Sequence, residues 1–290
     1  MLVAALVSEV GAWPLGCPGK PPTPGVTRGS RRPTQNQAGG YDGALMYILK
    51  ATNLVKRFGG RTVVDRVSLD VSEGEIVGLL GRNGAGKTTS FRMTMGMISP
   101  EGGEVIFNGQ DVTHLPMYLR AQRGMGYLAQ EPSVFQRLTV EENLLAILET
   151  RPLARPQMRQ RAEELMGQFD LTKLRRQQAR TLSGGERRKL EIARDLVSDP
   201  ALILLDEPFS GVDPVAVEEL QREIRRLRKD HHIAMLVTDH NVQRTLEICD
   251  RAYVIFEGKV FAHGTPREII NNEQVRKLYL GSTFKGDEFD

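Results

Sequence analysis

The stretch Gly81-Arg82-Asn83-Gly84-Ala85-Gly86-Lys87-Thr88-Thr89 follows the apolar run Ile76 to Leu80 and precedes a helix-like segment, Ser90 to Met97. It fits the pattern GxxxxGK[ST] in the context that this pattern requires, between a strand and a helix. Its glycines allow successive backbone N–H groups to turn toward phosphate oxygens, and the start of the following helix adds its dipole. This segment, called the phosphate loop below, therefore predicts a nucleotide site. The alternative is a glycine-rich turn that contains a lysine by chance.

Two side chains of the phosphate loop are predicted to have tasks of their own. Lys87 supplies a positive charge to the β- and γ-phosphates, and the Thr88 hydroxyl can ligate Mg²⁺. The residues predicted to bind nucleotide here are Gly81, Asn83, Gly84, Ala85, Gly86, Lys87, Thr88 and Thr89.

A second segment has the residues needed to hold a metal. The apolar run Leu202 to Leu205 ends in two adjacent carboxylates, Asp206 and Glu207, and a purely structural core strand has no use for such a pair. We expect Asp206 to accept a Mg²⁺-bound water and Glu207 to act as general base on the water that attacks the γ-phosphate. Acidic residues also simply terminate strands. The combination with the phosphate loop favours the catalytic interpretation.

Short β-branched runs alternate with helix-period segments from Met46 onward, which predicts an α/β fold around a parallel sheet. The predicted strands are Met46 to Ala51, Glu75 to Leu80, Tyr127-Leu128, Leu202 to Leu205 and Ala234 to Thr238, with a hairpin that turns at Glu257-Gly258. No strand pattern occurs between Thr139 and Arg180, and Thr139 with Glu142 forms a capping box. We therefore predict an inserted helical lobe over about residues 131–182.

Composition excludes several classes of protein. With 290 residues and a net charge of +3, the chain is no polycation built to coat nucleic acid. Its longest apolar runs are far shorter than the roughly 20 residues that a membrane-spanning helix needs. Two cysteines cannot form a disulfide framework. The arginines between Arg151 and Arg180 alternate with acidic residues, so we predict a solvated helical face and no nucleic-acid partner.

The first 45 residues differ from the rest. They hold six of the 15 prolines and eight of the 29 glycines, and such a segment buries too little apolar surface to offset the entropy of ordering. We expect residues 1–45 to be disordered, or to precede a true start at Met46. The segment lacks the positive start of a secretory signal, which favours a cytoplasmic protein.

The family is indicated by Leu182-Ser183-Gly184-Gly185-Glu186. By itself this segment is only a capping box of Ser183 with Glu186. It stands some 20 residues before Asp206 and some 100 residues after the phosphate loop. With that spacing, residues 46–282 resemble an ATP-binding cassette (ABC) ATPase, and 283–290 would be a C-terminal tail. The resemblance implies a P-loop NTPase core with a mainly parallel sheet, an antiparallel β subdomain and an inserted helical lobe.

The resemblance also implies ATP and Mg²⁺ as ligands and a head-to-tail homodimer with two ATPs between the chains. Ser183, Gly184 and Gly185 of one chain would contact the γ-phosphate held by Lys87 of the other. Asp213 would lie in the loop that crosses this interface, although it is otherwise an ordinary turn residue.

Three further positions match the family one by one. Phe58 would stack on adenine, the alternative being a core phenylalanine. Gln130 would reach Mg²⁺ and the attacking water, the alternative being a surface residue. His240 would hydrogen-bond the γ-phosphate and steady Glu207. The remaining histidines are predicted to be surface or structural residues: His114, His231, His232 and His263.

The chain shows no second cassette, so it is most similar to the motor subunit of a transporter. The segments Tyr127 to Val140 and Thr238 to Val242 are similar to lipopolysaccharide-export ATPases. That resemblance implies two LptF/LptG-like membrane subunits and peripheral attachment to the cytoplasmic face of the inner membrane. Phe135 would lie in the groove that receives a coupling helix, the alternative being plain core of the helical lobe. Ala129 and Gln136 depart from the usual proline and arginine.

Two other functions stay open at this point. The ending Tyr279-Leu280-Gly281 is shared with ATPases of branched-chain amino-acid importers. A soluble, non-transport cassette acting on ribosomes or DNA would usually carry two cassettes or long coiled-coil insertions, and neither is visible in the sequence.

Overall fold

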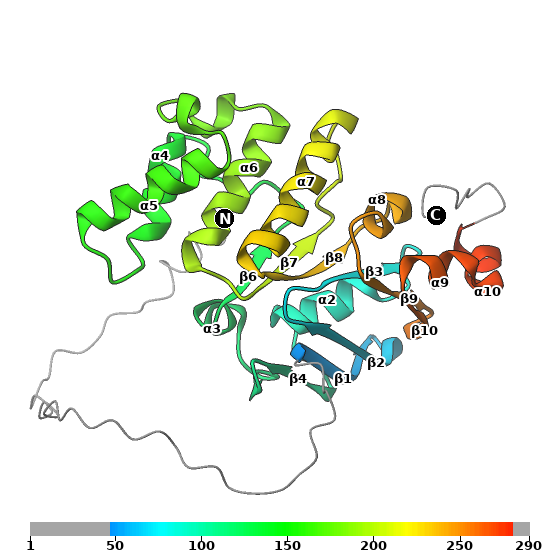
Figure 1. Ribbon diagram of the computed structural model, residues 1–290. Coiled ribbons are helices and arrows are strands. Elements are labelled where there is room, and N and C mark those ends of the chain that lie inside the picture. The colour runs from blue at the N-terminus through cyan, green and yellow to red at the C-terminus, as the bar shows by residue number, and fades with distance from the viewer. Residues whose placement is uncertain (1–46, 281–290) are drawn as a thin grey trace, which may run out of the picture. The chain divides into compact units, whose positions relative to one another are not determined.

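The computed structural model describes residues 47–280 (Figure 1). The expectations for residues 1–45 and for the tail 283–290 fall outside this range and stay predictions, as do the bounds proposed for the helical lobe. No helix within the described range is long and apolar enough to cross a membrane.

A six-stranded sheet forms the centre of the fold, in the order β10-β9-β3-β8-β7-β6. All neighbouring pairs are parallel except β9 with β10. Every residue of the central strands β3, β7 and β8 is buried, which explains why apolar runs predicted them. The strands are β3 (Ile76–Gly81), β6 (Met125–Leu128), β7 (Leu202–Asp206), β8 (Ala234–Thr238), β9 (Arg251–Phe256) and β10 (Lys259–Gly264).

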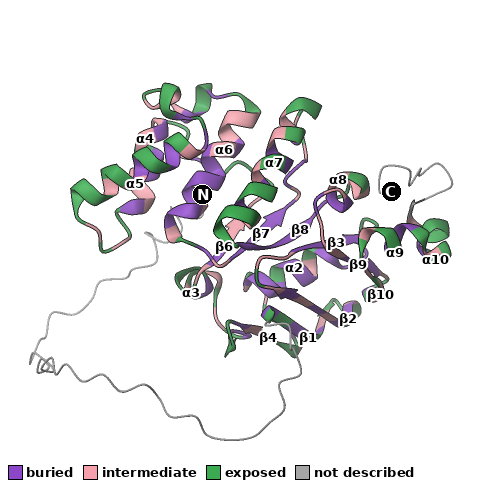
Figure 2. Cartoon of the chain, in the orientation of Figure 1, coloured by how far each residue is buried: buried purple, intermediate pink, exposed green. Residues whose placement is uncertain are grey.

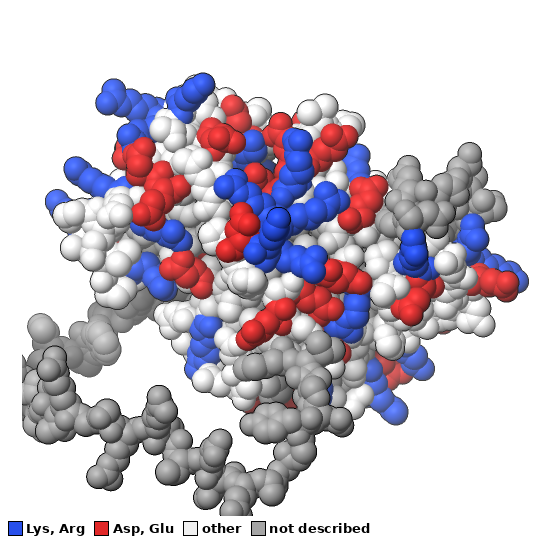
Figure 3. Space-filling model, viewed as in Figure 1, with Lys and Arg blue, Asp and Glu red and all other residues white. Residues whose placement is uncertain are grey.

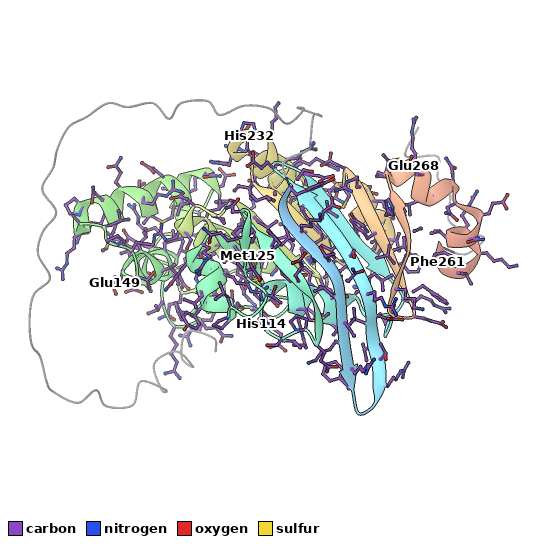
Figure 4. The ribbon with its side chains drawn as sticks, turned by 90° about the horizontal axis from the view of Figure 1, so that it is seen from below. His114, Met125, Glu149, His232, Phe261 and Glu268 are labelled. Carbon is purple, nitrogen blue, oxygen red and sulfur yellow. The ribbon has the colours of Figure 1, made fainter. Side chains whose placement is uncertain are left out.

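A four-stranded antiparallel sheet, in the order β2-β1-β4-β5, confirms the predicted antiparallel subdomain. Its strands are β1 (Tyr47–Phe58), β2 (Arg61–Ser72), β4 (Gly102–Phe107) and β5 (Gln110–Asp111). Seen from below in Figure 4, the turn that joins β1 to β2 projects from the rest of the sheets. The start of β2, just after this turn, comes close to the phosphate loop, because the Val63 carbonyl lies next to Gly86.

Helices cover the six-stranded sheet, and several form a group beyond β6 (Figure 1). Both predicted capping boxes are present, Thr139 with Glu142 and Ser183 with Glu186. The helices are α2 (Lys87–Met95), α3 (Met117–Gln122), α4 (Val140–Leu148), α5 (Arg155–Gln168), α6 (Gly184–Asp195), α7 (Pro214–His231), α8 (Val242–Leu246), α9 (Pro266–Asn271) and α10 (Glu273–Val275). Short helical turns are η1 (Thr172–Leu174), η2 (Ala179–Thr181), η3 (Leu196–Ser198) and η4 (Arg276–Leu280).

Apolar side chains on the two faces of the six-stranded sheet belong to different cores. Ile203 and Leu205 of β7 pack in the cluster that includes α4 to α7, whereas Leu202 and Leu204 pack in the cluster that includes the antiparallel sheet. Successive side chains of a strand point to opposite faces, and burying each one contributes about 1.5–3 kcal/mol. Figure 2 shows the corresponding pattern in the helices, buried toward the sheet and exposed outward. The carboxyl ends of the parallel strands are thereby fixed, and the predicted site residues follow them.

Candidate ATP site

The phosphate loop connects the buried end of β3 to α2. Gly86 adopts φ 104° at the N-terminus of that helix, and a Cβ placed there would lie 2.7 Å from the Val63 carbonyl oxygen. Both observations require glycine. The Lys87 ammonium is buried and donates hydrogen bonds to the backbone carbonyls of Gly81 and Arg82. Burial lowers the pKa of Lys87, against the attraction of the Glu207 and Asp239 carboxylates.

Asp206 ends β7 with only 6% of its surface exposed. The Tyr127 hydroxyl donates a hydrogen bond to its Oδ2 atom at 3.3 Å. Burial raises the pKa of Asp206, and the hydrogen bond from Tyr127 opposes that rise. A buried carboxylate is costly without partners, so a cation bound at this end of the strand would stabilise the charged form of Asp206.

Glu207 lies next to the two other residues that we predicted to be catalytic. The Gln130 side-chain amide donates to Glu207 Oε2 at 2.8 Å, and His240 Nδ1 lies 3.6 Å from the same oxygen. Glu207 has φ 46°, a conformation that is uncommon for a residue with a side chain and concentrates at functional sites. The structure therefore brings together Gln130, Glu207 and His240 around one carboxylate oxygen.

Asp239 is a site residue that sequence reasoning missed. It is fully buried, and its carboxylate accepts hydrogen bonds from the backbone N–H groups of Phe209 and Asn241. Its Oδ1 atom also lies 3.3 Å from Nδ1 of the exposed His240. Asp239 thus connects the loop after β7 to the loop after β8, and its carboxylate lies beside His240. Its position directly after a buried strand was the available signal.

Two cavities surround the phosphate loop. The larger, of about 1080 Å³, includes residues 81–85 together with His240 and Tyr279. The smaller, of about 260 Å³, lies against Lys87, Thr88 and Glu207. Because the smaller cavity joins a lysine, a hydroxyl and a carboxylate, it has the composition expected of a site for the terminal phosphates.

The residues predicted to hold Mg²⁺ carry chemical groups that fit this ion. The Thr88 hydroxyl, the Asp206 carboxylate and the Gln130 amide supply hard oxygen atoms, and Mg²⁺ typically binds one or two carboxylates, several waters and substrate phosphates. Among residues 47–280 there is no cluster of three or more His, Cys, Asp or Glu that would make an all-protein metal cage. Such a cage is not needed when the nucleotide itself provides ligands.

The predicted signature residues lie apart from the phosphate loop. Ser183 is exposed and caps α6, where its hydroxyl accepts a hydrogen bond from the Glu186 backbone N–H. Neither phosphate-loop cavity is lined by residues 183–185. Asp213 caps α7 by accepting a hydrogen bond from the Ala216 backbone N–H at 3.0 Å and is also exposed. Within one chain, neither segment lines the two cavities at the phosphate loop, and Gly184 lines a separate cavity that also includes Gln130 and Glu207.

The two predicted aromatic contacts lie at the surface or near it. Phe58 is 49% exposed at the end of β1, so the alternative of a core phenylalanine is excluded. Phe135 is half-buried with the Arg194 guanidinium 4.7 Å from its ring centroid, and its backbone is bound by the Asn143 side chain. Phe135 is therefore held in place with part of its surface open.

The four histidines that we predicted to have no role in the ATP site can also be placed in the structure. All four remaining histidines are exposed, including His114 and His232, which Figure 4 labels. On the face drawn in Figure 3, Lys and Arg are interspersed with Asp and Glu, as expected for a solvated surface.

Comparisons with known proteins agree with this geometry. The family model for "ABC transporter" matches residues 64–210, and that for "Branched-chain amino acid ATP-binding cassette transporter" matches residues 259–285. The chain is 51% identical over 241 residues to the lipopolysaccharide export system ATP-binding protein LptB of Haemophilus influenzae, covering 83% of this chain and 100% of that protein.

LptB of Escherichia coli strain K12 gives the same identity and coverage. Among solved structures, the ADP conformation of MJ1267, an ATP-binding cassette of an ABC transporter, is 28% identical with a TM-score of 0.73 and covers 81% of this chain and 99% of that one. The fold class predicted from sequence is confirmed, and the chain belongs to the family of ABC transporter ATP-binding proteins.

Proposed function

We propose that this chain is the ATP-hydrolysing subunit of a transporter that extracts lipopolysaccharide from the inner membrane toward the outer membrane. The observation that carries the proposal is the 51% identity to LptB proteins over their entire length. The chain would act as a homodimer, attached to the cytoplasmic face of the inner membrane through two LptF/LptG-like membrane subunits and without a nucleic-acid partner.

The charges of the site suggest how ATP is held. Lys87 would exchange its bonds to the Gly81 and Arg82 carbonyls for phosphate oxygens, and the backbone N–H groups of residues 83–89 would surround the β-phosphate. Phe58 would stack on adenine. Thr88, Gln130 and Asp206 would hold Mg²⁺, which when bound neutralises developing charge on the phosphates.

Glu207 would accept the proton of the attacking water. In the structure its Oε2 atom is bound by Gln130 at 2.8 Å and neighbours His240 at 3.6 Å. Gln130 would therefore orient the water together with Glu207, while His240 would hydrogen-bond the γ-phosphate. Asp239 would fix the position of His240 from behind.

Completion of the site would require the second chain. The γ-phosphate would be only partly coordinated until Ser183, Gly184 and Gly185 of the partner copy supplied further donors, with Asp213 at the interface. ATP would thus favour the closed dimer. Phosphate loss would then introduce repulsion and reopen it, and rotation of the helical lobes would move the membrane subunits.

The test is identification of the bound membrane proteins. The tagged chain is purified from detergent-solubilised membranes, and the proteins that accompany it are identified by mass spectrometry and reconstituted with it into vesicles. We expect two membrane subunits and ATP hydrolysis that extracts labelled lipopolysaccharide from the vesicles. Co-purification with ribosomes, unaffected by detergent, would contradict the proposal.

The match of residues 259–285 to branched-chain amino-acid transporters supports a second candidate, the ATPase subunit of an importer of those amino acids. The same reconstituted vesicles separate the two candidates. Uptake of labelled leucine dependent on a periplasmic binding protein, with no lipopolysaccharide extraction, would favour the importer.

A further inference from the structure

Tyr127 has a contact that the mechanism above does not use. It lies in β6, three residues before Gln130, and its hydroxyl is 3.3 Å from Asp206 Oδ2. Gln130 binds the neighbouring carboxylate, Glu207. One short segment therefore holds both carboxylates at the end of β7, each through a different side chain.

The fold fixes the Tyr127 ring from two sides. Tyr127 is paired with Leu204 in the parallel ladder of β6 and β7, so its distance from Asp206 is set by strand register. Its ring centroid lies 6.2 Å from that of Phe91, which is fully buried in α2. Phe91 belongs to α2, which begins at Lys87 within the phosphate loop. The Tyr127 ring therefore packs against the helix that continues the phosphate loop. This phenol is held by rigid elements and is only partly buried.

The hydrogen bond has a physical purpose. Asp206 is 6% exposed, and a buried carboxylate needs donors to fix its orientation and offset its desolvation. Groups that hydrogen-bond metal-binding carboxylates set the orientation of those carboxylates and tune metal affinity. A donor on the strand that leads to Gln130 can do this without entering the space of the phosphates.

We propose that Tyr127 is a positioning residue for the metal–nucleotide complex, orienting the Asp206 carboxylate through its hydroxyl; this rests on the proposed ATP and Mg²⁺ binding. The contact makes segment 127–130 a shared support for the metal-binding Asp206 and the water-activating Glu207. Displacing that segment then disturbs both carboxylates together.

The test uses Tyr127→Phe in the full chain, with Tyr118→Phe as the matched control because Tyr118 is 48% exposed on α3. Binding of a fluorescent, non-hydrolysable ATP analogue is measured with Mg²⁺ and with EDTA, and bound Mn²⁺ is measured by electron paramagnetic resonance. In Tyr127→Phe, we expect the ratio of analogue affinity with Mg²⁺ to that with EDTA to fall about tenfold. Affinity in EDTA should stay unchanged, and Mn²⁺ binding should weaken in parallel.

The outcomes are distinguishable. An unchanged ratio in Tyr127→Phe, or equal losses with Mg²⁺ and EDTA, would overturn the positioning role. No analogue binding by the unaltered chain would overturn the proposed ATP site itself. If Tyr127→Phe fails to fold, Phe91→Leu keeps the hydroxyl and loosens the ring, and a fall of a few fold in the same ratio is expected. An unchanged ratio in that variant would also overturn the proposal.

Discussion

The phosphate loop and the start of α6 are both rich in glycine and both begin a helix, yet the structure holds them differently. In the phosphate loop, Gly86 has a left-handed backbone and packs against the Val63 carbonyl, and Lys87 is bonded to backbone carbonyls. At the start of α6, a Cβ on Gly184 would meet nothing within 4 Å. The first region needs its glycines for its own fold, whereas Gly184 has no such reason within the described chain.

The difference indicates which half of the site is complete in one copy. The phosphate side is already organised by contacts within one chain, including the Gln130–Glu207 hydrogen bond. At the start of α6, the Ser183 and Gly184 end is held by the local cap between Ser183 and Glu186. A glycine that the chain itself does not require is explained by close approach of something else, which we propose to be the nucleotide held by a second copy.

The largest expected effect separates chemistry from assembly. Glu207→Gln removes the proposed general base, and hydrolysis should fall about 1000-fold, while ATP stays bound and a dimer accumulates. Phosphate release and size-exclusion chromatography with ATP measure the two properties. Glu218→Gln, an exposed change on α7, should alter neither. Wild-type turnover by Glu207→Gln would remove Glu207 from the mechanism.

The second largest effect is expected from a change at Gly184, at the start of α6. Gly184→Ala should leave the thermal midpoint unchanged or slightly higher, because alanine favours helix over glycine by up to about 1 kcal/mol. Hydrolysis should nevertheless fall about 100-fold, since the added methyl would displace the opposing γ-phosphate, and ATP should no longer induce the dimer.

Gly167→Ala is the matched control for Gly184→Ala. Gly167 lies within α5, and a Cβ there also meets nothing within 4 Å. This variant should gain stability and keep full hydrolysis. Equal hydrolysis in Gly184→Ala and Gly167→Ala would mean that the start of α6 is an ordinary helix terminus.

The parts of the fold that sequence predicted well are those whose pattern is unambiguous. Ala234 to Thr238 was predicted with correct bounds because a strand buried on both faces is apolar throughout. Strands β2 and β4 were not assigned residue by residue, because half-exposed strands mix charged and apolar residues. The bulges between β1 and β2 depend on tertiary packing that no local pattern encodes.

In the candidate site too, sequence predicted some features and missed others. Sequence motifs located the phosphate loop and the pair Asp206 and Glu207, since the residues of each motif are adjacent in the sequence. Sequence did not indicate that Asp239 would bind the Phe209 backbone or that Tyr127 would bind Asp206. Both contacts join segments that are distant in sequence and meet only because parallel strands end at the same edge of the sheet.

A smaller effect is expected from a change at Phe135, which belongs neither to the phosphate loop nor to the start of α6. Phe135→Ala should keep hydrolysis by the isolated chain near its normal rate, because Phe135 contacts Arg194 and Asn143 and lines neither phosphate-loop cavity. Capture of the membrane subunits should weaken about tenfold, as for loss of an aromatic anchor. Quantitative pull-down measures this, with Tyr118→Ala as control. Undiminished capture would count against a docking groove at Phe135.

The smallest effect is expected at the start of β3, the end of the strand away from the phosphate loop. A change there should lower the stability of the fold and leave ATP affinity unchanged. Glu75 and Arg251 form an ion pair beside the start of β3, and Arg251 also binds Asp70. Burial raises the pKa of Glu75, but hydrogen bonds from Arg251 and Ser72 outweigh it and hold that pKa below its ordinary value. Stability from this pair is therefore present at neutral pH and is lost as pH falls through the lowered pKa.

Arg251→Met should accordingly cost about 1 kcal/mol of unfolding free energy at pH 7, and the difference from the unaltered chain should shrink as the pH falls through the lowered pKa of Glu75 and this carboxylate becomes protonated. Denaturant unfolding at neutral pH and along a series of acidic pH values measures this. ATP affinity should stay constant, because Arg251 is at the opposite end of β9 from Phe256, which lines the larger phosphate-loop cavity. A loss of ATP affinity matching the loss of stability would show that the phosphate loop depends on the whole sheet, and that its organisation is less local than its contacts with Val63, Gly81 and Arg82 indicate.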